Sequence, residues 1–428
     1  MKAIFLAGLG FGDEGKGTIT DYLTRKLGAR LVVRYNGGFQ AAHHVVLPDG
    51  RWHCFSQYGS GTLAGARTHL SRFMIVNPEH FRNETHALET LGVEAPSSLV
   101  TVSPHALVAT PYHGILNRAR ERARGLGRHG SCGMGIGETV SMSIDHPALA
   151  LRVGHLRNEG VALYYLQKIR DFVLAELLRL KGEGNATDAE LGLSTEFRQA
   201  DVVPRALDDA RVFARTVRQA EDSGLPDMMR RAEVTIFEGA QGVLLDETHG
   251  FAPHTTWSDC TFWNAEKLVA PIRDDLELRK LGVLRCFQTR HGPGPMPTED
   301  AACLPLLDGD HNQEGPFQGP MRAGHLDLVL TKYAIDVLGG IDGIALTHMD
   351  KMRGHGVTPC THWNSEARLE FDGLRQAVQR RCGDAKAQTL VTMIRDTARF
   401  HSLFLRTIDT AIVIESDGPT HEDKWGTP

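Results

Sequence analysis

The chain has 428 residues, a hydrophobic fraction of 41% and a formal net charge of −5 at pH 7. A chain of this composition can bury a large core, which excludes a disordered or fibrous protein. The acidic balance argues against a nucleic-acid-binding surface, because such a surface needs an excess of Lys and Arg. A small site for a polyanion stays open, since one pocket can be positive on an acidic protein.

No linker, charge block or repeat of fixed period divides the sequence, so we expect one large domain with insertions over residues 1–428. The apolar start of the chain leads into a polar loop without a cleavage site, as a buried strand does. No segment approaches the roughly 18 uninterrupted apolar residues of a membrane span. The seven cysteines lack C-x-x-C spacing, which favours reduced thiols in a cytoplasmic protein and predicts no structural metal.

Short apolar runs rich in β-branched residues recur along the chain, and each leads into polar or glycine-rich residues. They are residues 3–7, 31–33, 234–237, 283–287, 343–346 and 410–414. Helical spacing lies between several of them, which predicts an α/β fold with a large, mainly parallel central sheet flanked by helices. Ligands of such sheets bind beyond the carboxyl ends of the strands, where polar residues of this chain gather.

The first run leads into a glycine-rich loop, GLGFGDEGKG at residues 8–17, and then into a helical pattern. A dinucleotide-binding fingerprint would need glycine where Asp13 stands. The spacing of the glycines and Lys16 fits a P-loop, although Gly17 replaces the Ser or Thr that usually binds Mg²⁺. We therefore expect a P-loop-like nucleotide site in which Asp13 replaces the hydroxyl and backbone N–H groups cradle phosphate. A glycine-rich turn with solvated charges is the alternative.

The second run leads into RYNGGFQAAHH at residues 34–44, which ends in the pair His43 and His44. Two histidines after a glycine turn are more often structural or exposed than catalytic. Their place beside the first loop of a parallel sheet favours the catalytic interpretation.

With these two loops in view, the sequence resembles the adenylosuccinate synthetase family, whose members join IMP and aspartate at the expense of GTP. The similarity extends discontinuously from residue 4 to about residue 420. It is strongest in GFGDEGKGTITDYL (10–23), VRYNGGFQAAHH (33–44), LRVGHL (151–156), FEGAQGVLLDETHG (237–250), GPGPMPTE (292–299) and SDGP (416–419). So many ordered matches indicate common ancestry, but they do not fix the substrate.

The resemblance implies catalytic roles for Asp13, His43 and Gln241. Asp13 would remove the proton from N1 of the purine and would bind Mg²⁺ together with the backbone carbonyl of Ala42. His43 would support phosphoryl transfer to O6 as a general acid or hydrogen-bond donor. The chemistry is sound in itself, because deprotonation makes the lactam oxygen a nucleophile, and the phosphorylated oxygen leaves when an amine attacks. Mg²⁺ and Lys16 would neutralise charge on the transferring group.

The resemblance also implies two sets of binding residues. The triphosphate set is Gly12, Asp13, Glu14, Gly15, Lys16, Gly17, Ala42, His43, His44, Asp350, Ser416, Gly418 and Pro419. The set for the acceptor and the amine is Asp13, Lys16, Gln40, Ala41, Ala42, His43, Cys132, Gln241, Thr256 and Arg322. Asp350 matches the aspartate that reads guanine, which favours GTP. His348 stands where the family has lysine, so ATP remains an alternative, as in viral 2-aminoadenine-type relatives.

Two segments depart from the family pattern. Gln40, Cys132 and Ala148 stand where the family holds the IMP phosphate, so that pocket is either lost or rearranged around other arginines. Residues 315–324, GPFQGPMRAG, keep one arginine, Arg322, where the family grips aspartate with a run of arginines. The donor is then either a less acidic amine or aspartate held by other basic residues.

These features predict an NTP-dependent C–N ligase, with GTP favoured, that phosphorylates the 6-oxo group of a purine nucleotide such as IMP and displaces it with an amine. One alternative is a relative that acts on a modified purine nucleotide or nucleoside, with ATP or dATP, or with a donor other than aspartate. Another is a nucleotide-binding regulatory protein without ligase activity. We expect a homodimer, as in the family, with no nucleic-acid or membrane partner.

Overall fold

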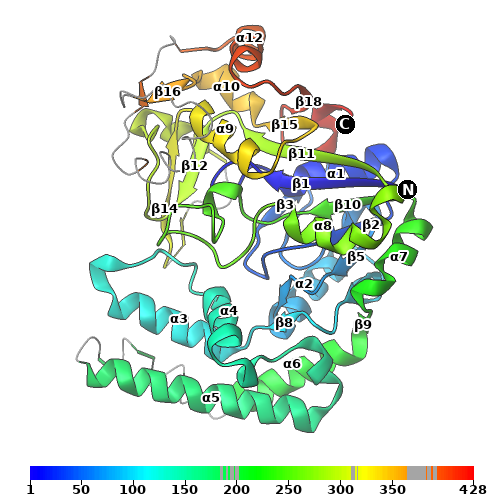
Figure 1. Cartoon of the computed structure of the whole chain (residues 1–428), viewed down its shortest axis with the longest axis vertical. Helices are drawn as coiled ribbons and strands as arrows, with labels where there is room; N and C mark the ends of the chain where they lie inside the picture. Colours follow the sequence, from blue (N-terminus) through cyan, green and yellow to red (C-terminus); the bar gives the residue numbers. More distant parts are fainter. Residues whose placement is uncertain are drawn as a thin grey trace.

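The computed structural model describes residues 1–183, 187–188, 191–192, 197, 202–309, 314–315, 317–363, 382, 387–388 and 393–428. Its centre is a ten-stranded sheet with the strand order β19-β18-β15-β11-β1-β10-β2-β5-β7-β9 (Figure 1). Neighbouring strands are parallel throughout, except that β19 is antiparallel to β18. The predicted α/β fold with a large, mainly parallel sheet is therefore confirmed.

Each of the six predicted runs overlaps a strand of this sheet. Its strands are β1 (Lys2–Gly8), β2 (Leu31–Arg34), β5 (Arg67–Leu70), β7 (Val100–Val102), β9 (Arg218–Gln219), β10 (Val234–Glu238), β11 (Glu277–Arg285), β15 (Gly343–Thr347), β18 (Ile412–Ser416) and β19 (Lys424–Gly426). β11 begins six residues before the apolar run, because its first half alternates between more and less exposed residues while it pairs with β1. An apolar run reveals only the half of the strand that is buried on both faces.

In the described residues, four small sheets lie outside the main one. They pair β3 (His43–Val46) with β4 (Trp52–Phe55), β6 (Ile75–Val76) with β8 (Leu107–Val108), β16 (His362–Trp363) with β17 (Ala387–Gln388), and β14 (Gly319–Gly324) with both β12 (Gln288–His291) and β13 (Glu314–Gly315).

Helices cover the sheet and extend beyond one of its ends. They are α1 (Lys16–Leu27), α2 (Pro78–Thr90), α3 (Pro111–Ala123), α4 (Ile136–Asp145), α5 (Glu159–Gly182), α6 (Val202–Thr216), α7 (Leu225–Ala232), α8 (Trp263–Val269), α9 (Leu328–Val337), α10 (Met349–His355) and α12 (Thr397–Thr407). Helices α3 to α6 form a separate layer below the sheet in Figure 1. Across the described part of the chain, no helix is long and apolar enough to cross a bilayer. The single domain over residues 1–428 stays a prediction.

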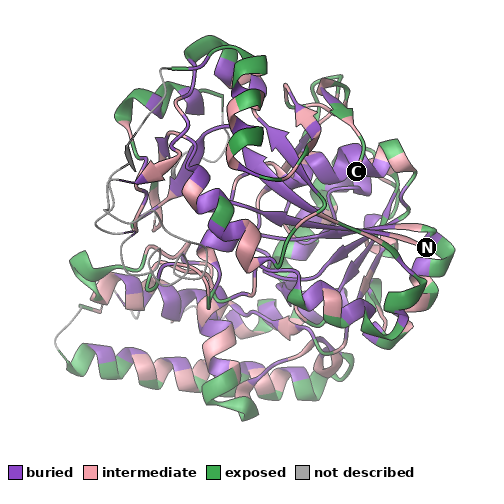
Figure 2. Cartoon of the chain, turned by 45° about the horizontal axis from the view of Figure 1, so that its top comes forward, coloured by how far each residue is buried: buried purple, intermediate pink, exposed green. Residues whose placement is uncertain are grey.

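The central strand β1 is buried from Ala3 to Gly8, as expected of a parallel strand covered on both faces. On one face Ile4 and Leu6 pack with Ile19 and Leu23 of α1. On the other face Phe5 packs edge-on against Phe237 of β10, with their ring centroids 4.7 Å apart. Figure 2 shows this burial concentrated along the middle strands. The sheet thus holds the loops at its carboxyl ends on a rigid base.

Helix α1 begins directly after the glycine-rich loop. Gly15 precedes it in a left-handed conformation with φ of 91°, and Gly28 ends it with φ of 64° and an N–H bonded to Thr24 O. The first turn contains no acidic residue. The partial positive charge of this helix end is therefore available to an anion.

Gly17 lies where β3 packs against the start of α1. A Cβ atom at position 17 would lie 2.7 Å from the Cβ of His43 and 3.0 Å from its carbonyl carbon. Contacts this short exclude a side chain unless the strand moves. This packing explains why the loop has glycine where a P-loop has Ser or Thr.

We predict that Gly17→Ala lowers the free energy of unfolding by about 1–3 kcal/mol, the usual cost of overpacking. Gly182→Ala is the matched control, because a Cβ added at the end of α5 meets no atom within 4 Å. The control should be neutral or slightly stabilising. Denaturant unfolding followed by circular dichroism measures both, and equal stability of the two variants would contradict the proposed packing.

Candidate active site

A cleft of about 1030 Å³ opens at the carboxyl ends of the parallel strands. The loops after β1, β2, β10, β15 and β18 all contribute to its walls. The predicted site residues that line it are Gly12, Asp13, Gly15, Lys16, Gly17, Gln40, Ala41, Ala42, His43, His44, Cys132, Gln241, Thr256, Asp350, Ser416, Gly418 and Pro419. Glu14 and Arg322, which belong to the same predicted sets, are not among its lining residues.

Backbone strain is concentrated in this cleft. Five non-glycine residues in the described part of the chain have a positive φ, and three of them line the cleft. They are Asp13 with φ of 59°, Gln241 with φ of 56° and His348 with φ of 61°. Residues held in this sparsely populated region cluster at functional sites, because the surrounding structure must maintain them for a purpose.

The side chain of Glu14 stabilises the glycine-rich loop from within. Its Oε1 accepts hydrogen bonds from the N–H of Gly10 at 3.0 Å and of Gly12 at 2.9 Å, and its Oε2 pairs with Nζ of Lys16. Both charged side chains of this pair are almost completely buried. The carboxylate therefore occupies two loop amides that a P-loop would offer to phosphate. The remaining amides are those at the start of α1, which have no intrahelical acceptor.

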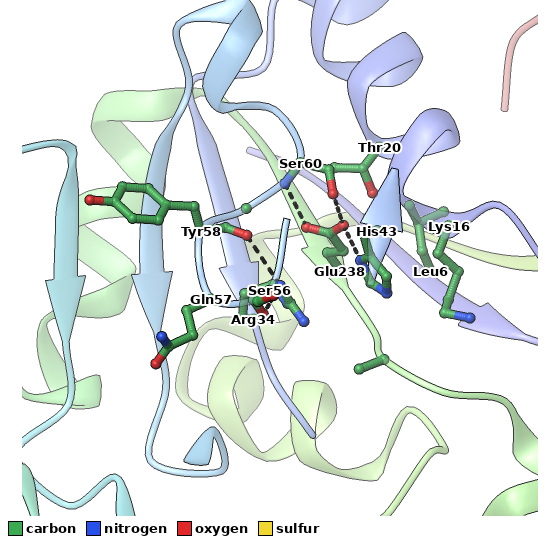
Figure 3. A network of polar contacts seen from close by, with 12 residues as sticks. Leu6, Lys16, Thr20, Arg34, His43, Ser56, Gln57, Tyr58, Ser60 and Glu238 are labelled. Atoms are coloured by element: carbon green, nitrogen blue, oxygen red, sulfur yellow. Dashed lines mark hydrogen bonds and ion pairs between the residues drawn. The ribbon is translucent and has the colours of Figure 1, made fainter. Parts of the chain in front are cut away.

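His43 is held in place by the buried carboxylate of Glu238 (Figure 3). Its Nδ1 lies 2.7 Å from Oε1 of Glu238, the last residue of β10. Glu238 also accepts hydrogen bonds from the backbone N–H of Ser60 at 2.9 Å and from the Ser60 hydroxyl. Because a carboxylate only accepts, the imidazole proton lies on Nδ1, and Nε2 is the nitrogen left for a ligand.

Burial lowers the pKa of His43, although the Glu238 carboxylate partly opposes the shift. Burial alone would raise the pKa of Glu238, but the charges of His43 and Arg34 and the hydrogen bonds from His43 and Ser60 lower it overall. We conclude that a neutral His43 imidazole lies against an ionised Glu238 carboxylate.

A second group of residues surrounds the far end of the glycine-rich loop. The Thr347 hydroxyl, at the end of β15, donates to Glu14 O at 2.7 Å and lies 2.8 Å from Nδ1 of His348. Burial lowers the pKa of His348 well below its usual value, so this ring is neutral. Asp350 follows in the first turn of α10, and Ser416 ends the neighbouring strand β18. The sheet thus brings together side chains that are far apart in the sequence.

Comparison with known proteins identifies this arrangement. A family model described as adenylosuccinate synthetase matches residues 5–388. The chain belongs to the adenylosuccinate synthetase family. The adenylosuccinate synthetases of Stenotrophomonas maltophilia and Xylella fastidiosa are 33% and 32% identical to it over 361 residues, which are 82% of this chain and 78% of each relative. The predicted ligase of this family is therefore confirmed.

Two solved structures share the fold. A fully ligated adenylosuccinate synthetase from Plasmodium falciparum superimposes with a TM-score of 0.80 and 19% identity over 100% of both chains. The second structure is cyanophage S-2L succinoaminodeoxyadenylate synthetase, bound to dGMP and to dATP as an energy donor. It superimposes with a TM-score of 0.64 and 18% identity over 100% of this chain and 95% of that one.

Acidic residues pair with the arginines around the Cys132 end of the cleft. Glu121 accepts hydrogen bonds from Arg124 at 2.6 Å and from the N–H of Gly130 at 3.0 Å. Glu138 pairs with Arg120, and burial raises the pKa of its carboxyl. The charges of Arg120 and Arg124 are therefore compensated by carboxylates of the protein.

The guanidinium groups on β12 and β14 are also bound within the protein. Arg322 pairs with Glu299 at 2.5 Å and donates to Gly294 O at 2.7 Å. Arg290 donates to three backbone carbonyls, those of Pro293, Pro295 and His254. Burial lowers the pKa of the Arg290 guanidinium to about 10. From residues 315–324, Met321 and Gln318 line the cleft, and Pro316 lies outside the described residues.

Several buried polar atoms of the cleft residues have no hydrogen-bond partner in the described part of the chain. They are Oε1 of Gln40, Oε1 of Gln241 and both ring nitrogens of His291. Buried polar groups are almost always paired, so this group of atoms indicates that a ligand completes the site.

Sequence reasoning missed Glu238, Ser60 and His291. Glu238 could have been found as an acidic residue that ends a buried apolar strand, where a charge needs a partner. Ser60 and His291 have no comparable signal, because their positions follow from how segments distant in the sequence pack together.

We predict that Glu238→Gln lowers the kcat of the ligase by roughly 10- to 100-fold, the scale seen when a group that orients a metal-binding histidine is lost. The pKa of His43 should fall further, because the carboxylate raises it. Steady-state kinetics and an NMR titration of His43 measure the two effects. Glu89→Gln, at an exposed position of α2, is the control. An unchanged kcat and an unchanged His43 titration would show that Glu238 does not act on His43.

Proposed function

We propose that this chain uses a nucleoside triphosphate to phosphorylate the 6-oxo group of a purine nucleotide such as IMP, and then displaces that group with an amine. The observation that carries the proposal is the convergence of Asp13, Lys16, His43 and Gln241 on one cleft at the carboxyl ends of the sheet. Each belongs to a segment in which the sequence resembles the family most strongly.

In the proposed first step, the Asp13 carboxylate accepts the proton of purine N1, and the O6 oxygen attacks the γ-phosphorus. Lys16 lies at the start of α1 and pairs with Glu14, but its ammonium has three donors, so it and the helix amides can hold the phosphate oxygens. A polyanion beside His43 raises the pKa of its imidazole, which favours an imidazolium paired with Glu238. Nε2 then donates to the transferring group while Glu238 keeps the ring oriented.

The residues near Asp13 have donor atoms suited to Mg²⁺. The carboxylate of Asp13, whose side chain is 26% exposed, and the backbone carbonyl of Ala42 both belong to residues that line the cleft. Both are hard oxygen ligands, and Mg²⁺ is commonly bound by one or two carboxylates plus substrate phosphates. A bound Mg²⁺ would neutralise negative charge on the phosphates.

GTP is the proposed phosphate donor. Asp350 lines the cleft in the first turn of α10, near Ser416 and Gly418. A carboxylate at this position can accept the N1 and N2 hydrogens of guanine, which adenine does not offer. His348 presents a neutral ring that can stack on a base. ATP or dATP is the alternative, and the cyanophage relative is described with dATP as its energy donor.

The amine is proposed to be less acidic than aspartate. Arg322 and Arg290 are both engaged by groups of the protein, and Met321 lines the cleft beside them. Two carboxylates in a partly dry cleft need cations with free hydrogen-bonding capacity. This observation also favours the alternative of a relative with a donor other than aspartate.

Measurement of phosphate release decides between these functions. GTP and ATP are each combined with IMP, dGMP or nucleosides and with a panel of amines. Phosphate release that requires both a purine and an amine supports the ligase. Tight binding of a triphosphate with no turnover in any combination would support the regulatory alternative.

We also propose a homodimer in the cytoplasm, as expected of this family. All seven cysteines are free thiols, which suits a reducing compartment. Sedimentation at micromolar concentration tests the dimer.

We predict that Asp13→Asn abolishes turnover and leaves triphosphate binding within about tenfold of the unmodified chain, because the base is lost while the phosphate site is kept. Asparagine tolerates the left-handed backbone of position 13. Single-turnover kinetics and calorimetric titration with a non-hydrolysable triphosphate measure the two effects. Near-normal turnover would rule out Asp13 as the base.

Aspartate is predicted to be a poor donor, with kcat/KM roughly 10- to 100-fold below that of a well-matched amine. Initial rates with IMP and GTP are compared for aspartate, glycine, asparagine, glutamine and ammonia. Saturation by aspartate at sub-millimolar concentration, lost in Arg322→Ala, would show instead that Arg322 leaves Glu299 to bind the donor.

A further inference from the structure

His291 has a buried polar side chain that makes no hydrogen bond in the described part of the chain. It ends β12, its side chain is 7% exposed, and it lines the cleft. Neither ring nitrogen has a hydrogen-bond partner in the described part of the chain. Ring nitrogens of His43, His69 and His113 bond to neighbouring protein groups. Among the described histidines that have a buried unpaired ring nitrogen, His53, His401 and His421 have one such nitrogen each, whereas His291 has two. A histidine kept only for packing would be expected to satisfy its nitrogens, because unpaired buried polar atoms are costly.

His291 lies close to the proposed base and to the segment proposed for the amine donor. Its Nε2 lies 3.7 Å from Oδ2 of Asp13, the proposed base for purine N1. On its other side, β12 pairs with β14 so that His291 lies opposite Met321, in the segment proposed for the donor. C6, the atom that the amine attacks, is bonded to N1, so a purine with N1 at Asp13 has C6 close to the same carboxylate. His291 lies near Asp13 on one side and pairs with Met321 on the other.

On the basis of the proposed function, we propose that His291 positions the amine donor. A ring nitrogen accepts a hydrogen bond from the donor's amino group and holds the nitrogen lone pair toward C6. Met321 and Gln318 complete the donor site, which suits a small amine without a second carboxylate. Arg290 and Arg322 are already bound to groups of the protein. The imidazole of His291 therefore recognises the amino group that reacts, and no arginine of β12 or β14 is needed to bind a carboxylate of the donor.

The step balances without a further reactant. The amine nitrogen forms a bond to C6, the C6–O bond breaks, and its electron pair leaves on the phosphate oxygen. One amine proton is transferred to the leaving group, which departs as hydrogen phosphate. His291 holds the nucleophile during this exchange and need not change its own protonation state.

The test separates the two half-reactions. Formation of the 6-phosphoryl intermediate is followed without donor, by migration of ¹⁸O from the β,γ-bridge of the triphosphate in the presence of the purine nucleotide. Overall turnover is then measured while ammonia or glycine is titrated. His291→Ala should lower kcat/KM for the amine by roughly tenfold or more and change the isotope exchange by less than about threefold. His291→Asn, which keeps a hydrogen-bond acceptor, should recover part of the loss.

His86→Ala is the control, because that histidine is 83% exposed on α2. Normal dependence on the amine in both His291 variants would overturn the inference. A loss of isotope exchange equal to the loss of turnover would also overturn it, because His291 would then act on Asp13 or on the acceptor. If the unmodified chain shows no exchange with any purine and triphosphate, the proposed function itself fails, and that result is distinct from the other two.

Discussion

The candidate site depends on the buried carboxylate of Glu238. This group ends a central strand and receives hydrogen bonds from His43 and from two groups of Ser60, so it fixes three separate segments against one another. His43 in turn packs on Gly17, which sets the start of α1 against β3. A buried charge is tolerable only when its partners are in place, so loss of any one of them leaves a costly group behind. The same interaction thereby couples the packing of the sheet to the orientation of the imidazole.

Much of the fold could be predicted because parallel strands buried on both faces form apolar runs. β1 is buried along most of its length for this reason, and the loops at the strand ends could be assigned to one edge of the sheet. The contacts inside the site could not be predicted in this way. Glu238 and His43 are 195 residues apart, and their pairing follows from strand order. The early start of β11 was missed because its first half is partly exposed.

Charge in this cleft is determined by pairing more than by composition. Arg322 is the one arginine of residues 315–324. By sequence alone it was therefore a candidate to bind a carboxylate of the donor. In the structure its guanidinium is already bound to Glu299 and to a backbone carbonyl. A cation in this state binds a substrate only by giving up existing hydrogen bonds, which reduces the net gain. The number of arginines in a motif therefore overstates the positive charge that a ligand can use.

The left-handed residues of the cleft show the limit of local sequence rules. Asp13, Gln241 and His348 have a positive φ, which is uncommon for a non-glycine residue although Asp and His adopt it more often than most. Their conformations are imposed from outside the loops. Leu6 O accepts the N–H of Gly239, and Gly10 O accepts the N–H of Leu244, so the turns after β1 and β10 hold each other. Each of these turns carries one of the residues proposed to contact the purine, which means that the two contacts are set together. A substitution that relaxed either backbone would therefore displace both groups, even if it touched neither side chain.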